Sequence, residues 1–364
     1  MTKSNPPNLF SSHQLGRIEL KNRIVMSPMT RSRALGNVPN ELMASYYAQR
    51  AEAGLIVTDG TSPSPEGLGY ARIPGLFNAA QVAGWKKVTD AVHAAGSRMF
   101  VQLMHTGRVT HPDNLPSGAT MVAPSAIEWV GKMWVDGKGE LPIPTAHALS
   151  VEEIERVIAD YVRSAELAIE AGFDGVELHG DNGYLIEQFL NTAANQRTDE
   201  WGGSVENRLR FVLEIAKRSA AKIGSDRLGI RVSPYSAAGG LRSGDDQVED
   251  VYERLAGELK KLGFVYMHVV DHSSLGGPTV PDSVKDKIRT AFGGTVILAG
   301  GYDRVRAEAD LAAGRGDLVA FGRPFIANPR LPSRLRENLP LAQPDFNAFY
   351  TPDEKGYTDY PLAP

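Results

Sequence analysis

Short apolar runs rich in β-branched residues alternate along the chain with longer segments in which apolar positions recur every three or four residues. The first pattern predicts buried strands and the second predicts helices with one packed face. Four of the helical segments span 40–54, 150–172, 204–224 and 247–263. The eight strands that we expect span 22–28, 55–61, 98–105, 175–180, 227–234, 265–271, 295–301 and 318–324.

This repetition favours an α/β fold, a closed (β/α)8 TIM barrel that forms a single domain over residues 1–364. Helix boundaries agree with it, because several helical segments end at glycine and Ser150 with Glu153 has capping-box spacing. A doubly wound sheet is the alternative, but it would usually show a glycine-rich turn after its first strand. The sequence contains no G-x-G-x-x-G, no G-x-x-x-x-G-K-[ST] and no H-E-x-x-H.

Two segments do not belong to the repeat. Residues 9–22 alternate like a β-hairpin with a turn near Gly16, which we expect to close the bottom of the barrel. Residues 106–149, after the third strand, are rich in proline and glycine and show no clear period. A loop of that length in a compact domain is usually functional, so we expect a lid-like insertion.

Composition narrows the class of partner. The 364 residues carry a formal net charge of -4, with 42% hydrophobic and 23% charged residues, so nothing suggests a nucleic-acid partner. No window is apolar enough to span a membrane and the N-terminus lacks the apolar core of a secretion signal. We therefore expect a soluble cytoplasmic protein with a small-molecule partner. The absence of cysteine excludes disulfides, thiolate metal sites and cysteine nucleophiles.

Polar residues and glycines gather at the C-terminal ends of the predicted strands, where barrels of this class place their active sites. Each one alone has a plain structural interpretation: His105 as a hydrogen-bonded core histidine, Arg231 as half of a buried ion pair, and the glycines as turn residues. Their shared face favours a binding site. The residues concerned are Pro28, Thr30, Asp59, Gly60, Gln102, His105, His179, Arg231, Asp271, Gly300, Gly301, Gly322 and Arg323.

The chemistry of these groups suggests a planar ligand that carries an anion. The glycines at the ends of strands seven and eight let backbone N–H groups approach a phosphate, and Arg323 can clamp it. Arg231, inside strand five, requires an anion or an electron-rich ring nearby, because an unpaired buried charge is costly. Gln102 offers a donor and an acceptor together, which suits the edge of a heterocycle.

Longer motifs make a specific combination: HGDNGYLIEQFLNTAANQRTDEWGGSVENR from His179 to Arg208, with RIVMSPMTRSRA, YYAQRAEAGLIVTDGT, VQLMHTGR, GIRVSP, VAFGRPFIANP and GYTDYP. In this combination, over residues 8–362, the chain resembles the Old Yellow Enzyme family of FMN-dependent ene-reductases. The resemblance implies the barrel fold, tightly but non-covalently bound FMN, and NADPH or NADH as the hydride donor.

The resemblance also implies roles for individual residues. His179 and Asn182 would hold the activating oxygen of the substrate, and Tyr184 would donate a proton. Substrate contacts would come from Tyr70, Met104 and Tyr350. The flavin ring and its phosphate would be held by Pro28, Met29, Thr30, Gly60, Gln102, His179, Arg231, Gly300, Gly301, Gly322 and Arg323.

The implied reaction is a ping-pong transfer of hydride from flavin N5 to an activated alkene, such as an α,β-unsaturated carbonyl, a maleimide or a nitroalkene. We expect a monomer or a weak homo-oligomer. Met104 stands where relatives often carry Trp or Phe, and Ser27 where alanine is more common. Asn182 gives a His/Asn pair where several nitroester reductases have His/His. Nitro or nitrate-ester reduction as the main activity is the alternative within the same chemistry.

Two other classes remain as alternatives. A metal-dependent barrel hydrolase would use Glu177, His179 and Asp181 with His105 or His268, and residues 177 and 179 do point the same way from a strand. No paired metal-ligand motif supports it. The other alternative is a flavin-storage protein without turnover.

Overall fold

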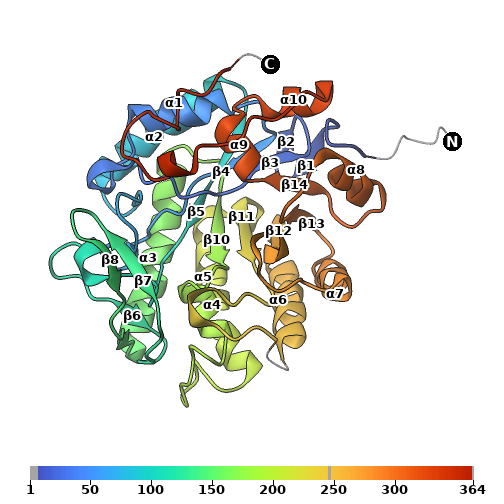
Figure 1. Ribbon diagram of the computed structural model, residues 1–364. Helices are drawn as coiled ribbons and strands as arrows, with labels where there is room; N and C mark the ends of the chain where they lie inside the picture. The colour runs from blue at the N-terminus through green and yellow to red at the C-terminus, as the bar shows by residue number, and fades with distance from the viewer. Residues whose placement is uncertain (1–6, 245–246, 363–364) are drawn as a thin grey trace.

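The computed structural model describes residues 7–244 and 247–362, and a closed barrel of parallel strands lies at its centre (Figure 1). The (β/α)8 fold predicted from the sequence is confirmed. In the order in which they pair around the barrel, the strands are β3 (Ile24–Met26), β4 (Leu55–Val57), β5 (Arg98–Leu103), β10 (Gly175–Gly180), β11 (Leu228–Val232), β12 (Tyr266–Val270), β13 (Thr295–Ala299) and β14 (Leu318–Phe321).

Several strands end earlier than the sequence predicts, and at the end of β4 a side chain takes the place of a backbone partner. After Val57, the hydroxyl oxygen of Thr58 accepts a hydrogen bond from the backbone N–H of Gln102 at 3.0 Å. An isolated bridge between Thr61 and Leu103 follows, and Gly60 lies outside the strand.

The barrel interior is filled by apolar side chains from alternate strand positions, with the N-terminal hairpin below them. The hairpin comprises β1 (His13–Leu15) and β2 (Ile18–Leu20), which pair antiparallel as predicted. Its Leu15 and Leu20 belong to the same buried cluster as Val57 and Phe100 of the barrel. The hairpin therefore covers one end of the barrel core and leaves the other end for the ligand.

Helices surround the barrel and pack their apolar faces on the outside of the strands (Figure 1). The capping box of Ser150 and Glu153 is present at the start of α3. The helices are α1 (Glu41–Gln49), α2 (Ala79–Ala94), α3 (Val151–Glu170), α4 (Leu185–Leu190), α5 (Val205–Ile223), α6 (Val248–Leu262), α7 (Asp282–Phe292), α8 (Arg304–Ala312), α9 (Arg323–Ala327) and α10 (Leu331–Glu337). Within the described ranges, none is long and apolar enough to cross a membrane.

The insertion at 106–149 contains strands that the sequence analysis did not predict. They are β6 (Val122–Ala123), β7 (Lys132–Val135), β8 (Gly139–Pro142) and β9 (His147–Ala148), and β7 pairs antiparallel with β8. Met133 and Val135 point inward while their neighbours in β7 are exposed, a period-two pattern too short to stand out from the surrounding loop. Met133 packs in one cluster with Met104 and Tyr184. The insertion thus lies against the top of the barrel, and its role as a lid stays a prediction.

Candidate active site

A cavity lies at the C-terminal ends of the barrel strands. Every residue in its lining is one that the sequence analysis had assigned to the cofactor or the substrate. The structure thus brings together residues that are up to 203 positions apart, Pro28 and Arg231, while their individual roles remain predictions. The lining residues are Pro28, Met29, Thr30, Gly60, Gln102, Met104, His179, Asn182, Tyr184 and Arg231.

The turn after β10 presents two of these side chains, Asn182 and Tyr184, because its backbone adopts left-handed conformations. Asn182 has φ 58° and Gly183 has φ 76°, a region that asparagine tolerates and glycine favours. A Cβ on Gly183 would lie 2.3 Å from the carbonyl oxygen of Ala238, so the next loop also requires glycine there.

Glu187 fixes this turn from behind. One carboxyl oxygen accepts a hydrogen bond from the N–H of Gly183 at 2.7 Å, and the other accepts from the hydroxyls of Ser233 (2.9 Å) and Tyr252 (3.2 Å). Burial raises the pKa of Glu187 to about 8. The sequence analysis missed this residue, because at its place in the amphipathic run it looks like an ordinary helix carboxylate.

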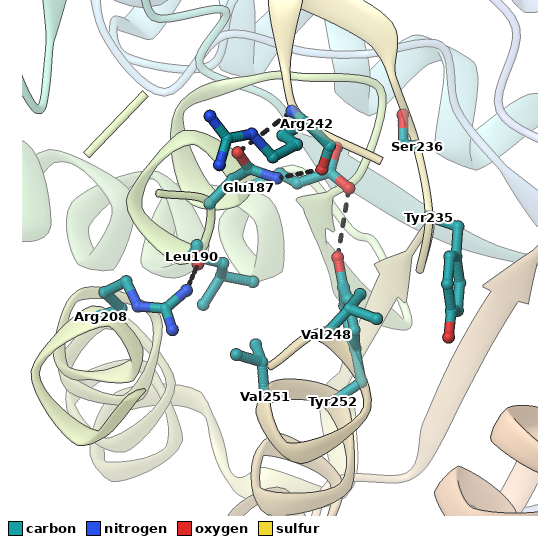
Figure 2. Close-up of a pocket in the computed structure, with 10 residues that line it drawn as sticks. Glu187, Leu190, Arg208, Tyr235, Ser236, Arg242, Val248, Val251 and Tyr252 are labelled. Atoms are coloured by element: carbon teal, nitrogen blue, oxygen red, sulfur yellow. Dashed lines mark hydrogen bonds between the residues drawn. The ribbon is translucent and has the colours of Figure 1, made fainter. Parts of the chain in front are cut away.

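Glu187 also lines a second pocket, with Tyr252 and two arginines, Arg208 and Arg242 (Figure 2). This pocket shares no lining residue with the first. The turn that carries Asn182 is therefore supported by a polar network on a different side from the candidate site.

Tyr184 is deeply buried and contacts two other rings. Its hydroxyl lies 2.7 Å from that of Tyr70, and its ring centroid lies 4.8 Å from that of His179. Burial raises the pKa of Tyr184 well above its ordinary value, and the charge and hydrogen bond of Tyr70 raise it further. Tyr70 thus reaches the site through Tyr184. Tyr350, the other predicted substrate contact, is 59% exposed and does not line the cavity.

Arg231 and His179 share a buried carboxylate. Arg231 donates a hydrogen bond from Nη1 to Asp181 Oδ2, and His179 Nδ1 lies 2.6 Å from Asp181 Oδ1. The structural interpretation of Arg231 as half of a buried ion pair is confirmed, and because Arg231 also lines the cavity, its contact with a ligand stays a prediction. For Asp181, the sequence analysis had considered only a role as a metal ligand.

A second buried carboxylate, Glu177, lies beneath Gln102. It accepts hydrogen bonds from Gln102 Nε2 (2.8 Å) and from the hydroxyl of Tyr266 (3.0 Å), and it pairs with His268 Nδ1 at 2.9 Å. Glu177 and His179 thus have separate partners. Among the residues that the structure describes, no group of three His, Asp or Glu side chains could hold a metal ion, so the hydrolase alternative loses its ligand set.

His105 matches its plain interpretation. It is fully buried, it does not line the cavity, and its Nδ1 accepts a hydrogen bond from the N–H of Gly107 at 3.1 Å. Burial lowers the pKa of His105 to about 3, so the ring is neutral.

The predicted phosphate residues lie at the ends of β13 and β14, beside the cavity but outside its lining. A Cβ on Gly300 would meet the carbonyl oxygen of Asp271 at 2.1 Å, and Gly301 has φ 62°. A Cβ on Gly322 would lie 3.7 Å from Met29 Sδ, which joins this region to the cavity. Arg323 is exposed, and within the described part of the chain it forms no ion pair.

These features fit the flavin mononucleotide that the family resemblance implies. Among the described residues, the Nε atom of Arg231 is buried without a hydrogen-bond partner, and Gln102, whose Nε2 donates to Glu177, lines the cavity. A planar ring in the cavity would offer partners to both. The glycines, with Arg323 unpaired, would suit a phosphate on the adjoining strand ends.

Comparison with known proteins agrees with this interpretation. Residues 8–342 match the model of the NADH:flavin oxidoreductase / NADH oxidase family. Chanoclavine-I aldehyde reductase of Penicillium roqueforti is 45% identical over 98% of this chain and 96% of its own length. For 12-oxophytodienoate reductase 1 of Oryza sativa subsp. japonica, the identity is 40% over 97% of this chain and 93% of its own length.

Solved structures are similar over almost the whole chain. Morphinone reductase superposes with a TM-score of 0.95 at 44% identity, covering 99% of this chain and 97% of its own. The old yellow enzyme homologue from Zymomonas mobilis gives a TM-score of 0.94 at 41% identity, covering 98% of this chain and 100% of its own. Morphinone reductase has also been solved in complex with tetrahydroNAD, at a TM-score of 0.93 and 45% identity, with 98% of this chain and 97% of that one covered.

Proposed function

Since the chain belongs to the NADH:flavin oxidoreductase / NADH oxidase family and is an Old Yellow Enzyme homologue, we propose that it is an FMN-dependent ene-reductase. It takes hydride from NADPH or NADH and reduces the C=C bond of an activated alkene. The relatives compared above are named as reductases, and one was solved with a nicotinamide analogue. The observation that carries the proposal is the single cavity lined by His179, Asn182 and Tyr184 together with Arg231.

Bound FMN supplies the transfer of hydride from the nicotinamide to the β-carbon of the alkene. His179 and Asn182 act on the carbonyl or nitro oxygen of the substrate, where negative charge develops as the β-carbon is attacked. Both line the cavity, and Asn182 is fixed there by its turn. Donors aimed at a developing oxyanion are worth about 3 kcal/mol each.

Tyr184 donates a proton to the α-carbon. An acid with this role must remain protonated at neutral pH, and burial raises the pKa of Tyr184 well above its ordinary value. Proton transfer from a positioned side chain typically contributes about 10²–10⁴ in rate. The short distance between the rings of Tyr184 and His179, 4.8 Å between centroids, supports a joint role for the two residues at one substrate.

Arg231, Thr30 and Gln102 hold the ring. Arg231 lines the cavity as half of an ion pair with Asp181, and its guanidinium can donate a hydrogen bond to the ring. Gln102 is kept in one orientation by Glu177, and this leaves its carbonyl oxygen for an N–H group of the heterocycle. The asparagine at 182 favours alkenes over nitrate esters as substrates.

The test begins with protein purified without loss of cofactor. It should show flavin absorbance, bind FMN again after removal, and turn over 2-cyclohexenone with NADPH or NADH under anaerobic conditions. A protein that cannot be reconstituted with FMN would refute the proposal. Bound flavin without alkene turnover would point to flavin storage, and faster turnover of glycerol trinitrate than of any alkene would favour nitrate-ester reduction.

A further inference from the structure

Asp181 lies between two residues of the candidate site and is completely buried. Strand register aligns His179 of β10 with Arg231 of β11, so a carboxylate on the turn just after β10 can reach both. It accepts a hydrogen bond from Arg231 and lies 2.6 Å from His179 Nδ1. The three side chains form one buried chain of charged and titratable groups beside the cavity.

The carboxylate of Asp181 is ionised in the folded protein. Burial by itself would raise the pKa of Asp181, but the charge of Arg231 and then that of His179 outweigh burial and hold the pKa below its ordinary value. A buried carboxylate is tolerated when a cationic partner such as Arg231 is paired with it.

This arrangement changes what a ligand in the cavity meets. Arg231 lines the cavity, and its Nε is buried without a hydrogen-bond partner among the described residues. Its Nη1 is already paired with Asp181. A ring placed in the cavity therefore faces an ion pair, whose net charge is close to zero, instead of an isolated cation.

We propose that Asp181 is a positioning residue that holds Arg231 and His179 at the cavity and, through its negative charge, sets the reduction potential of bound flavin below the value that Arg231 alone would give. The proposal rests on the proposed function, because it requires flavin in this cavity. Its physical basis is that a buried negative charge opposes the addition of electrons to a nearby ring, and such charges interact strongly where water is excluded.

Asp181→Asn tests the proposal, because it removes the charge and keeps the shape. The midpoint potential of bound FMN should rise by at least about 30 mV, which is a tenfold shift for a two-electron couple. Asp181→Glu, which keeps the charge, should lie closer to the wild type than Asp181→Asn does. Spectroelectrochemical titration of protein loaded with one FMN per chain measures the midpoint potential of the wild type and of both variants.

Asp174→Asn is the matched control. Asp174 directly precedes β10, at the opposite end of the strand, and it also pairs with a histidine and an arginine, His93 (2.8 Å) and Arg98 (3.4 Å). The potential should be unchanged in this variant. An equal shift in Asp174→Asn, or an unchanged or lowered potential in Asp181→Asn, would overturn the proposal.

A second pair of variants, both carrying Arg231→Gln, tests the proposal if Asp181→Asn does not fold with Arg231 left unpaired. Arg231→Gln and Arg231→Gln with Asp181→Asn differ only in the carboxylate charge, and the double variant should have the higher potential; equal potentials there would overturn the proposal. The proposed function is tested separately, because wild-type protein that binds no FMN or reduces no alkene contradicts that function before any variant is compared.

Discussion

The hydroxyl of Tyr184 lies 2.7 Å from the hydroxyl of Tyr70, at the edge of the cavity that Tyr184 lines. Tyr184→Phe should slow the reduction of the alkene by about 10²–10⁴ while the flavin is still reduced by nicotinamide at the wild-type rate. The reason is that only the second half-reaction needs a proton from this phenol. Anaerobic stopped-flow measurement of the two half-reactions separates them.

Tyr70→Phe is the matched control, since it removes the partner hydroxyl and keeps the proton donor. Its effect on alkene reduction should be smaller than that of Tyr184→Phe. The raised pKa of Tyr184 also predicts that this half-reaction does not lose the acid form of Tyr184 as the pH rises from 6 to about 10, the ordinary pKa of a tyrosine. Equal rates in Tyr184→Phe and wild type would remove Tyr184 from the mechanism.

Glu187 gives a prediction about stability and pH. Its pKa is about 8 in the folded protein, above the ordinary 4.5, so the folded state binds more protons between these values. The stability that Glu187 contributes is present below about pH 4.5 and is lost as the pH rises to about 8. Relative to Glu187→Gln, which does not titrate, wild-type apoprotein should lose about 1.4 kcal/mol per pH unit in this window. Urea denaturation between pH 5 and 8 measures it.

Glu249→Gln is the control, because the pKa of Glu249 is shifted in the opposite direction from that of Glu187. The hydrogen bond from Lys287 lowers the pKa of Glu249, so the stability from this pair is present above the ordinary pKa of a glutamate and is lost as the pH falls below it. A constant difference between wild type and Glu187→Gln from pH 5 to 8 would mean that the Glu187 carboxyl ionises normally.

The sequence predicted the barrel, its hairpin and the strand-end residues of the cavity because each follows from topology, whereas the family resemblance supplied the remaining lining residues, Met29, Met104, Asn182 and Tyr184. Parallel strands in a barrel bring their C-terminal ends to one face, so a polar residue at each end, such as Gln102 or Arg231, must lie near the others. Which side chains contact one another does not follow from the topology of the barrel. Asp181 contacts Arg231 only because of the β10–β11 register, and Tyr70 contacts Tyr184 across 114 positions of chain.

Gly60 and Met104 give a prediction about cofactor binding. A Cβ on Gly60 would lie 2.3 Å from Met104 Sδ, and both residues line the cavity. Gly60→Ala should displace the methionine and weaken FMN binding by tenfold or more. Adding Met104→Ala should restore part of that affinity, because it removes the sulfur that the new methyl group meets. Fluorescence titration of apoprotein with FMN measures each affinity.

Gly257→Ala in α6 is the control for a glycine substitution, because a Cβ there meets no atom within 4 Å. It should leave the affinity for FMN unchanged. If Gly60→Ala with Met104→Ala binds FMN no better than Gly60→Ala alone, the steric explanation is wrong.

Arg323 should discriminate FMN from riboflavin. It is exposed and near the glycines of the predicted phosphate site, and its guanidinium lies 6.0 Å from the ring centroid of Phe346. Arg323→Ala should weaken FMN binding by about 1.5–3 kcal/mol, the usual worth of a hydrogen bond to a charged group, and should leave riboflavin binding unchanged. Arg336→Ala, which removes a similar arginine 5.0 Å from the ring of Phe10, should affect neither ligand. Equal losses for both ligands in Arg323→Ala would place the phosphate elsewhere.

Asn182 combines a strained backbone with a side chain that faces the cavity, so one substitution cannot separate the two contributions. Asn182→Ala loses the amide and also places alanine at φ 58°. This left-handed region costs most L-residues about 1–2 kcal/mol, less for asparagine and aspartate. Asn182→Gly loses the amide and removes that strain. If the amide holds the substrate oxygen, both variants should retain FMN and slow alkene reduction by about 10²–10³.

The two variants should then differ in thermal stability but not in the rate of alkene reduction measured by stopped flow. A slow Asn182→Ala beside a fast Asn182→Gly would show that the backbone conformation matters and the amide does not. Asn182→His compares the His/Asn pair of this chain with a His/His pair, since it replaces the amide by a second imidazole. It should keep a donor at this position and raise the turnover of glycerol trinitrate relative to 2-cyclohexenone, because charge on a nitrate group is shared between two oxygens and each would need its own donor. An unchanged ratio of the two rates would contradict this explanation.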